Sequence, residues 1–356
     1  MTASWSGTLF ASRDPPMRQF RWSLFLNLGL VCVTILISLV GAEEMLRLKT
    51  HVYPMQRGWV GQFQNRPSLN FITDAQTGWR MRPNHSFVWT ADQFAHTYRS
   101  NSQGFRSDSD FDAGDRRLKL AFVGDSFTFG TGVANEETFL SFVEKGAPDR
   151  ISWNFGMPGF GVDQVWLSAR HQALPLKPDL LVVGLINADF ERSQVTFRRL
   201  EGFGKPTFKL VSGQLIERTN EQPPNALTQY IDESSLLWAV WQRAVRSVSI
   251  RFGLGEYWTL NQAIIDALRE DSRKAGVPVL FVYIPIKGLQ PFPALRSYMQ
   301  RTGAAYIDLT EQRPVPPRSI YLPHDSHLSV EGHRYVADLI EQWLKSHPSV
   351  ALRAHR

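Results

Sequence analysis

Three residue types that together perform nucleophilic catalysis occur near the two ends of one long stretch of this sequence. Ser126 follows Gly124 and Asp125 directly after a short apolar run, whereas Asp325 and His327 lie in a polar stretch near the carboxyl terminus. A serine hydroxyl is a poor nucleophile until a base takes its proton and a third group orients that base. Asp325 and His327 are close enough in sequence for the carboxylate to hold one ring nitrogen while the other faces outward. The three side chains are therefore a candidate Ser-His-Asp set.

Each of these short motifs is common by chance, so the hypothesis depends on their occurring together. The sequence contains no G-x-S-x-G elbow, S-x-x-K, H-E-x-x-H or G-x-x-x-x-G-K-[ST]. Their absence argues against an α/β-hydrolase, a penicillin-binding protein, the commonest type of zinc protease and a P-loop nucleotide-binding protein. His324, His327 and His333 form an alternative metal-binding cluster, but no acidic partners follow at a metal-site spacing. We therefore expect neither a metal nor any other cofactor.

The elements that must bring these residues together are predicted by an alternation of short apolar runs with amphipathic runs. The expected strands are residues 118–123, 151–155, 179–185, 277–284 and 305–309, and the expected helices are 137–145, 162–174, 257–275, 293–301 and 330–346. Five parallel strands with helices between them must bury both sheet faces, which predicts a three-layer α/β/α sandwich with right-handed crossovers. Ligands bind at the carboxyl ends of such strands, so Ser126 is well placed for chemistry.

The G-D-S at residues 124–126 and the D-x-H at 325–327 resemble the first and last conserved blocks of the SGNH (GDSL-type) hydrolases. The resemblance covers about residues 118–346 and implies a flavodoxin-like α/β fold. It implies Ser126 as the nucleophile, His327 as the base and Asp325 as the partner that orients the base. It also implies an oxyanion hole made of the Ser126 N–H, the N–H of a second-block glycine and an asparagine side chain. Such donors stabilise the charge that develops in the tetrahedral intermediate.

The second and third blocks of the resemblance carry the other two oxyanion donors. Residues 154–161, NFGMPGFG, follow the second expected strand, and Gly159 best matches the donor position, with Gly156 as the alternative. The third block departs from the family pattern, because G-x-N-D is here GLINAD at residues 184–189. Either Asn187 serves as the donor, displaced by one residue, or Ala188 occupies the asparagine position. The spacing of two between Asp and His, where many members have three, is similar to the branch associated with exported polysaccharide acetylation and envelope proteins.

An uncharged run at residues 22–41 predicts a membrane anchor. At about 1.5 Å per residue, it just spans a hydrocarbon core of about 30 Å. We expect a transmembrane helix at residues 22–42 in contact with the lipid bilayer. A cleaved signal peptide is the alternative, although its apolar region normally covers only about 7–15 residues. Since a short basic tail before a first helix usually stays in the cytoplasm, residues 1–21 are expected inside and the remainder outside. With the family resemblance, this predicts a single-pass protein of the bacterial inner membrane with a periplasmic domain.

In residues 43–117 the hydrophobic residues follow no regular period over a long stretch, and several prolines interrupt the sequence. This pattern indicates a lead-in segment or a small strand-rich cap before the domain at 118–348. The motifs at 74–84 and 101–106 resemble lead-in motifs of membrane-anchored bacterial members of the family. We favour a simpler interpretation, in which they form a packed cap with an ordinary proline turn and arginine hydrogen bonds.

Residues 192–252, approximately, interrupt the alternation of strands and helices. They contain an expected hairpin at 208–217, turning at Ser212-Gly213, and an aromatic helical stretch at 227–248. Insertions at strand ends commonly line a site, so this segment is a candidate lid or substrate surface. Packing of Trp238 and Trp241 on the domain is an equally good alternative.

Composition limits the remaining classes of function. The 356 residues are 43% hydrophobic and 20% charged, which excludes disordered and coiled-coil proteins. A mean hydropathy of −0.23 excludes a multi-span transporter. The single cysteine, Cys32, excludes an intrachain disulfide and a cysteine-based zinc site. The net charge of +6 permits an anionic partner, but the basic residues are scattered, so we expect no nucleic acid partner.

These observations predict a membrane-tethered, extracytoplasmic serine esterase that removes acyl groups, acetyl foremost, through an acyl-serine intermediate. The expected partner is an acylated carbohydrate or another ester substrate. The first alternative is a polysaccharide O-acetyltransferase with the same triad, in which a sugar hydroxyl replaces water. The second alternative, motivated by the irregular sequence around Asn187, is a non-catalytic envelope or polysaccharide-assembly protein.

Overall fold

The structure is a computed structural model that describes residues 16–50, 70–91, 94–193, 197–198, 203–218, 255–286, 292–312 and 320–351. The expected aromatic helical stretch at 227–248, with Trp238 and Trp241, lies outside the described residues.

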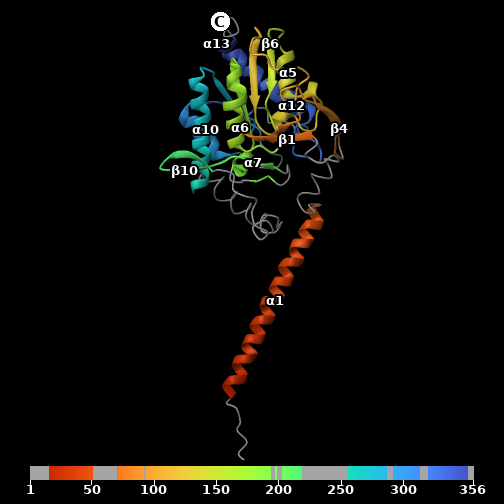
Figure 1. Ribbon diagram of the computed structural model, residues 1–356, viewed down its shortest axis with the longest axis vertical. Helices are drawn as coiled ribbons and strands as arrows, with labels where there is room; N and C mark the ends of the chain where they lie inside the picture. Colours follow the sequence, from red (N-terminus) through yellow and green to blue (C-terminus); the bar gives the residue numbers. More distant parts are fainter. Residues whose placement is uncertain are drawn as a thin grey trace, which may run out of the picture.

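A parallel five-stranded sheet forms the centre of the molecule, and it confirms the expected α/β/α architecture (Figure 1). Its strands are β5 (Leu118–Val123), β6 (Arg150–Asn154), β7 (Leu180–Leu185), β12 (Val279–Tyr283) and β13 (Ala305–Asp308). They lie in the order β13-β12-β7-β5-β6, and every neighbouring pair is parallel. This is the flavodoxin-like order, in which the second strand, β6, lies on one side of the first strand, β5, and the three later strands lie on its other side. Ligands bind in such sheets where the carboxyl ends of β5 and β7 lie side by side.

Helices cover both faces of this sheet because successive strand residues point to opposite sides. In β5, Leu120 and Phe122 belong to one buried cluster, whereas Ala121 and Val123 belong to the other. The first cluster includes apolar residues of α5 (Phe139–Lys145) and α12 (Val330–Ser346). The second includes α6 (Val162–Ser168), α10 (Gly255–Lys274) and α11 (Pro293–Thr302).

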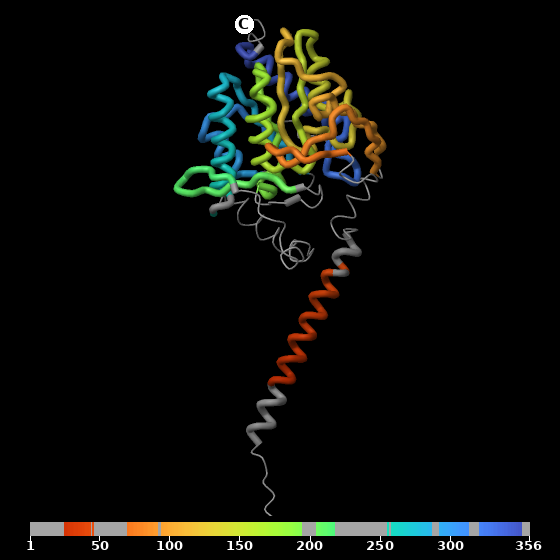
Figure 2. Tube along the Cα trace, viewed as in Figure 1, coloured from red at the N-terminus to blue at the C-terminus, as the bar shows by residue number. Residues whose placement is uncertain are grey.

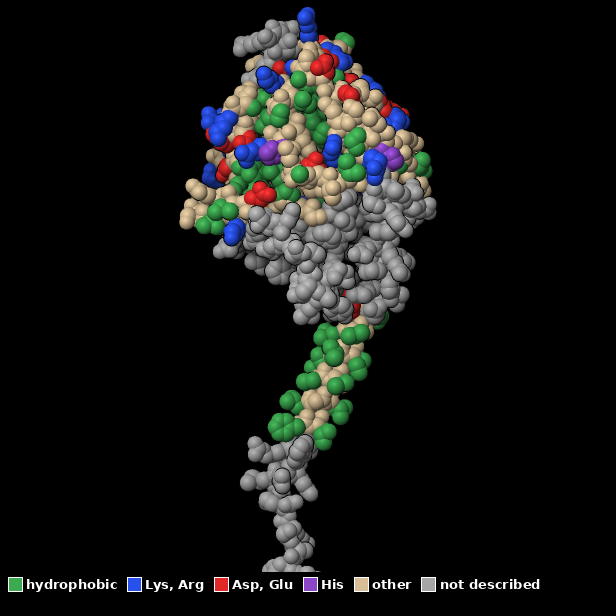
Figure 3. All heavy atoms as spheres, in the orientation of Figure 1, with side chains coloured by type: hydrophobic (Ala, Val, Ile, Leu, Met, Phe, Trp, Pro, Cys, Tyr) green, Lys and Arg blue, Asp and Glu red, His purple; other side chains and the backbone are tan. Residues whose placement is uncertain are grey.

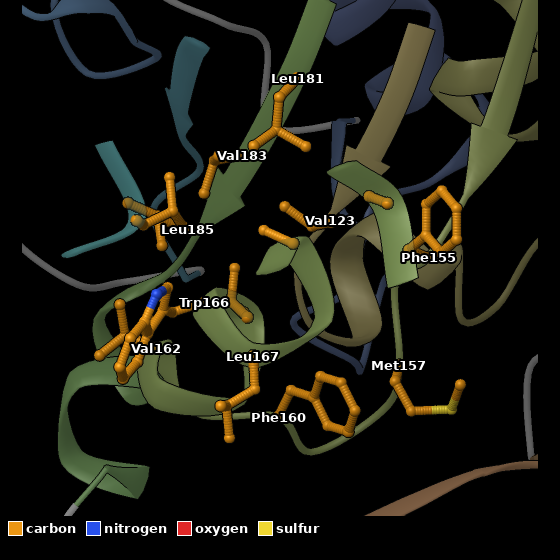
Figure 4. Packing of buried hydrophobic residues seen from close by; sticks show 14 of the residues in the cluster. Val123, Phe155, Met157, Phe160, Val162, Trp166, Leu167, Leu181, Val183 and Leu185 are labelled. Atoms are coloured by element: carbon orange, nitrogen blue, oxygen red, sulfur yellow. The ribbon is translucent and has the colours of Figure 1, made fainter. Parts of the chain in front are cut away.

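Figure 4 shows the second cluster next to the carboxyl ends of the strands, where Val183 and Leu185 of β7 lie near Trp166 of α6. Phe160 and Met157, from the loop before α6, complete this part of the core. The same packing thus supports both the sheet and the loop that follows β6.

The expected helix at 162–174 is shorter than predicted. The α-helical part ends at Ser168 and continues as a π-helical turn, η2 (Ala169–Ala173), and a 3-10 turn, η3 (Leu174–Leu176). Pro175 has no N–H to donate to the carbonyl of His171, four residues earlier, and its ring clashes with that carbonyl, so the last turn of the expected helix cannot be α-helical. The expected helix at 137–145 is likewise divided into η1 (Asn135–Glu137) and α5, because the Thr138 hydroxyl caps the new helix by accepting from Ser141 N.

Two antiparallel hairpins form much of the lead-in segment, in line with the expected strand-rich cap. They are β1 (Phe71–Asp74) with β2 (Gly78–Met81), and β3 (Ser86–Ala91) with β4 (Phe94–Arg99). In Figure 2 the lead-in, in orange, lies across the yellow and yellow-green segments of the α/β body. Arg106 fixes it there, since its buried guanidinium donates to the carbonyls of Phe129, Gly130 and Val133. The packed-cap interpretation with arginine hydrogen bonds therefore describes this segment well.

The insertion after β7 is described in part. It contains the short pair β8 (Phe197–Arg198) and β9 (Phe203–Gly204), followed by the hairpin β10 (Thr207–Val211) and β11 (Gln214–Arg218), which turns at Ser212-Gly213 as predicted. Phe208 packs on Trp166 of α6. Lys205 forms a fully buried ion pair with Asp163 of the same helix. The hairpin is thus attached beside α6, and its role as a lid stays a prediction.

Helix α1 (Pro16–Thr50) extends away from the α/β body in Figure 1. Its segment Phe25–Glu43 is long and apolar enough to cross a membrane, a property that signal sequences share. Figure 3 shows this segment as a rod of mainly hydrophobic side chains. Leu36 and Ile37, for example, are more than 60% exposed, which is unfavourable in water but suits a lipid environment.

Candidate active site

The candidate nucleophile lies at the carboxyl end of β5, where the chain turns into the four-residue helix α4 (Ser126–Phe129). Asp125 caps this helix, because its Oδ1 accepts from Phe127 N at 2.9 Å. Ser126 is the first helical residue, and its side chain is buried. Helix α4 is too short to produce a periodic pattern, which is why the sequence does not predict it.

Glycines let α4 lie unusually close to the sheet. A Cβ added to Gly124 would lie 2.1 Å from the Thr128 hydroxyl, and one added to Gly184 of β7 would lie 2.2 Å from it. A Cβ on Gly156 would lie 2.4 Å from the backbone nitrogen of Phe129. The glycines of all three motif blocks therefore make room for the helix that carries Ser126.

The candidate base lies in a loop that is held at both ends. An antiparallel bridge joins Tyr321 to Leu328, and Ser329 caps α12 by accepting from Gly332 N at 3.1 Å. Gly332 is required here because a Cβ would lie 2.0 Å from the carbonyl oxygen of Ile320. The Ser329 N-cap thus supports the loop on the amino-terminal end of α12.

Ser126, His327 and Asp325 form one continuous chain of hydrogen bonds. Ser126 Oγ lies 2.8 Å from His327 Nε2, and His327 Nδ1 lies 2.7 Å from Asp325 Oδ1. The same carboxylate oxygen also accepts from the backbone N–H of His327 at 2.9 Å. The structure thus brings together the three residues that the sequence selected as nucleophile, base and orienting partner.

The electrostatics of the Asp325 carboxylate determine which tautomer His327 adopts. Burial alone would raise the pKa of Asp325, but the hydrogen bonds and charge of His327 outweigh it and hold this pKa at about 2. An ionised carboxylate only accepts hydrogen bonds, so Nδ1 of His327 must carry a proton. In a neutral ring Nε2 is then an acceptor, and it faces the hydroxyl of Ser126. This is the arrangement in which imidazole acts as a general base.

The second block distinguishes between the two candidate glycine donors. The N–H of Gly156 is already bonded to Asn154 Oδ1 at 3.0 Å, whereas the N–H of Gly159 donates to none of the described residues. Gly159 has φ of +82° and follows Pro158, which places it in a tight turn that favours glycine. The loop is tied to the nucleophile motif, because Met157 N donates to Gly124 O at 3.0 Å. The geometry favours Gly159 as the oxyanion donor.

The third block places Asn187 at the start of helix α7 (Asn187–Arg192), directly after β7. Its Oδ1 accepts from the Tyr283 hydroxyl at 2.5 Å. Since the oxygen is occupied, the amide NH₂ group points the other way, and it has no partner among the described residues. Ala188 has no polar side-chain atom, so Asn187 is the side chain in this block that can donate to an oxyanion.

Arg192 connects the three blocks through one guanidinium nitrogen. Its Nη1 donates to Asp125 Oδ2, to Asp189 Oδ1 and to the carbonyl of Phe160, at distances of 2.9–3.0 Å. Burial raises the pKa of Asp189 well above its usual range, and the nearby Asp125 raises it further. Sequence reasoning did not single out Arg192 as a site residue, since it depends on contacts between three separate loops.

The two other histidines of the candidate metal cluster do not join His327 in a common site. His333 is fully buried, and its Nδ1 accepts from Phe139 N at 3.1 Å. In the part of the chain that the structure describes, no three His, Cys, Asp or Glu side chains converge in a geometry that would hold a metal.

Comparisons with known proteins yield similar solved structures. No protein-family model and no curated protein matches the chain. An acetyl xylan esterase is 16% identical over 64% of this chain and 100% of its own length, with a TM-score of 0.38. A GDSL-like lipase from Bacteroides thetaiotaomicron is 13% identical over 65% of this chain and 89% of its own, with a TM-score of 0.37. An esterase from Pseudoalteromonas sp. is 12% identical over 64% and 99%, also with a TM-score of 0.37.

Proposed function

We propose that this protein is a serine esterase of the SGNH type. The observation that carries the proposal is the unbroken chain from Ser126 Oγ through the His327 ring to Asp325, with distances of 2.8 and 2.7 Å. Three candidate oxyanion donors accompany it, namely the backbone N–H groups of Ser126 and Gly159 and the side-chain NH₂ of Asn187. Nucleophile, base, orienting group and oxyanion donors together are the set that acyl transfer through serine requires.

The proposed reaction proceeds in two halves. His327 Nε2 takes the proton of Ser126 Oγ while Oγ bonds to the acyl carbon, and the carbonyl electron pair moves to the oxygen held by the donors. The intermediate collapses, the leaving alkoxide takes the proton from His327, and an acyl-serine remains. Water then attacks with the same base, and the carboxylic acid leaves as Ser126 regains its proton. Asp325 stabilises the imidazolium in both halves.

We propose an acylated carbohydrate, with acetyl as the acyl group, as the substrate. The support is the two-residue spacing of Asp325 and His327, which is similar to the branch associated with polysaccharide acetylation. The apolar segment Phe25–Glu43 supports a tether to the bacterial inner membrane with the catalytic domain outside the cytoplasm. A carbohydrate of the cell envelope is the ester that such a tethered enzyme would meet.

The decisive experiment uses the full-length protein in detergent and the variant S126A. We expect S126A to lose p-nitrophenyl acetate turnover and fluorophosphonate labelling. The control S152A removes a buried hydroxyl on β6 that has no hydrogen-bond partner among the described residues, and it should retain both. Labelling of S126A equal to that of the native protein would refute the proposal.

The second measurement separates hydrolysis from transfer. The protein is incubated with a labelled acetyl donor and an oligosaccharide acceptor, and the products are analysed. Free acetate alone supports the esterase, whereas labelled oligosaccharide supports an O-acetyltransferase. Full complementation of a deletion strain by both S126A and H327A would instead support a non-catalytic envelope role.

A further inference from the structure

Two buried aromatic side chains contact the atoms that orient the candidate oxyanion donors. We propose that Trp79 and Tyr283 are positioning residues. Each donates a hydrogen bond to the carbonyl oxygen of an amide group and thereby fixes the N–H of that same amide group as an oxyanion donor. The proposal rests on the proposed function. It gives the lead-in segment, through Trp79, a part in catalysis.

Trp79 bonds to the peptide unit that carries the Gly159 N–H. Its Nε1 donates to the carbonyl oxygen of Pro158 at 3.1 Å, and the indole is 1% exposed. The carbonyl of Pro158 and the N–H of Gly159 belong to one planar trans peptide, in which the two groups point in opposite directions. The bond that holds the carbonyl toward Trp79 therefore holds the N–H away from it.

This orientation needs to be held because the turn has two available forms. Phe160 N donates to Met157 O across the turn at 3.3 Å, with Pro158 and Gly159 as its central residues. Proline followed by a glycine with φ of +82° forms a type II turn. In a type I turn, the peptide unit between these two residues is rotated by about 180°. Since glycine tolerates either form, the Trp79 bond selects the one in which the N–H is turned away from the lead-in.

The indole is itself well fixed. Its ring packs edge-on against Phe160, with 5.2 Å between the ring centroids. In the turn directly before β2, Thr77 O accepts from Gln164 Nε2 of α6 at 2.6 Å. One hydrogen bond and an aromatic contact thus join the lead-in to the loop that carries Gly159, and a second hydrogen bond joins the lead-in to α6.

Tyr283 plays the corresponding part for Asn187. It is the last residue of β12, its side chain is fully buried, and its hydroxyl donates to Asn187 Oδ1 at 2.5 Å. Burial raises the pKa of Tyr283, so the hydroxyl keeps its proton at any pH used for an assay. With the oxygen held by Tyr283, the NH₂ group of Asn187 is directed to the opposite side.

Both contacts serve catalysis in the same way. A donor that is already oriented costs no reorganisation when negative charge develops on the substrate oxygen. An amide whose oxygen accepts a hydrogen bond is also polarised, which strengthens its own N–H as a donor. The two contacts should therefore stabilise the transition state, which raises kcat, and leave the binding of the neutral ester unchanged.

The test compares W79F and Y283F with matched controls in the full-length, detergent-solubilised protein. W153F removes an indole N–H that has no acceptor among the described residues, and Y298F removes a buried hydroxyl that donates to Asp266. For p-nitrophenyl acetate we expect kcat to fall about five- to tenfold in W79F and in Y283F, as for loss of one hydrogen bond. KM should stay within twofold, and both controls should match the native protein.

A transition-state analogue supplies a readout that a purely structural role would not change. An alkylboronic acid forms a tetrahedral adduct with a catalytic serine and places an oxygen in the oxyanion hole. Its inhibition constant should rise in W79F and Y283F by the same factor as kcat falls. If W79F folds poorly, benzothienylalanine at position 79 replaces the indole N–H by sulfur while keeping the ring volume, and the same factor is expected.

Outcomes for this proposal and for the proposed function are distinguishable. If S126A is inactive and kcat in W79F or Y283F stays within twofold of the native value, the positioning role is wrong for that aromatic residue. If the boronic acid binds all variants equally while kcat falls, the residues act through general structure and the proposal is overturned. Retained activity in S126A refutes the function itself, and with it the premise of this proposal.

Discussion

Ser126 and His327 lie 201 positions apart in the chain, and yet Ser126 Oγ is 2.8 Å from His327 Nε2. They meet because one follows the carboxyl end of β5 and the other directly precedes α12, which packs on the same sheet through the first buried cluster. The phenyl ring of Phe127 lies 5.0 Å from the His327 ring, so the pair is partly shielded from water. The distance is set by the sheet and not by any local motif.

The Asp325 carboxylate should matter for the rate and not for substrate binding. In D325N the amide cannot fix the Nδ1–H tautomer of His327, so kcat should fall by about 10⁴-fold, as in other triads. KM should change little. Steady-state kinetics on p-nitrophenyl acetate measure both values, with the solvent-exposed D110N as a control. A fall of less than tenfold would show that Asp325 does not orient the base.

Asn187 and Ala188 can be separated as candidates for the third oxyanion donor. We expect N187A to lower kcat by about 10²–10³-fold, the usual effect of removing one oxyanion donor. A188S should leave kcat near the native value, because the side chain of residue 188 does not supply the donor. Equal kinetics in N187A and the native protein would remove Asn187 from the oxyanion hole.

The close contact between Gly184 and Thr128 predicts a compensatory pair. In G184A the new methyl group would lie 2.2 Å from Thr128 Oγ1, while the next nearest atoms are 3.6 Å or more away. Overpacking of this kind costs about 1–3 kcal/mol and should displace α4, which lowers both stability and activity. Thr128 Oγ1 has no hydrogen-bond partner among the described residues, so T128A alone should be mild.

The double variant G184A/T128A tests the reason for this glycine. Removing Oγ1 leaves only ordinary contacts around the added methyl group, so most of the lost thermal stability and activity should return. Thermal unfolding and kinetics of the four proteins in the cycle measure the coupling. Additive losses in the double variant would contradict the assigned contact.

His333 should make the protein less stable in acid. Burial, reinforced by the charges of Arg106 and His327, lowers the pKa of His333 to about 3, from an ordinary value of 6.5. Between these values the unfolded chain binds a proton that the folded chain does not, so stability rises with pH through this window. The stabilisation is complete above about pH 6.5 and is lost as the pH falls toward 3. Protonation would also remove the acceptor of Phe139 N.

The measurement compares melting temperatures at pH 7 and pH 5. H333Q keeps an acceptor for Phe139 N but does not titrate, so its melting temperature should fall less between the two values than that of the native protein. H347Q, which alters an exposed histidine, serves as the control and should behave like the native protein. An equal fall in H333Q and the native protein would exclude His333 as the source.

The sequence by itself determined the sheet, most of its helices and the catalytic candidates. β5 and α12 have the predicted bounds, because apolar residues recur with the periods of a strand and a helix, and those periods are local properties. Ser126 was selected because it follows an expected strand, at whose carboxyl end ligands bind, and Asp325 and His327 were selected by their residue types and close spacing. The short helices α4 and α7 were missed because four to six residues show no period.

Only the tertiary structure favours one of each pair of alternatives that the motifs left open. The N–H of Gly156 is occupied while that of Gly159 is not, and Asn187 is turned by Tyr283. The contact of Trp79 with Pro158 likewise joins residues 79 positions apart. These distinctions depend on the direction of individual amide groups and on contacts between distant segments. Such directions are set by packing across the whole fold, and no local pattern of residue types encodes them.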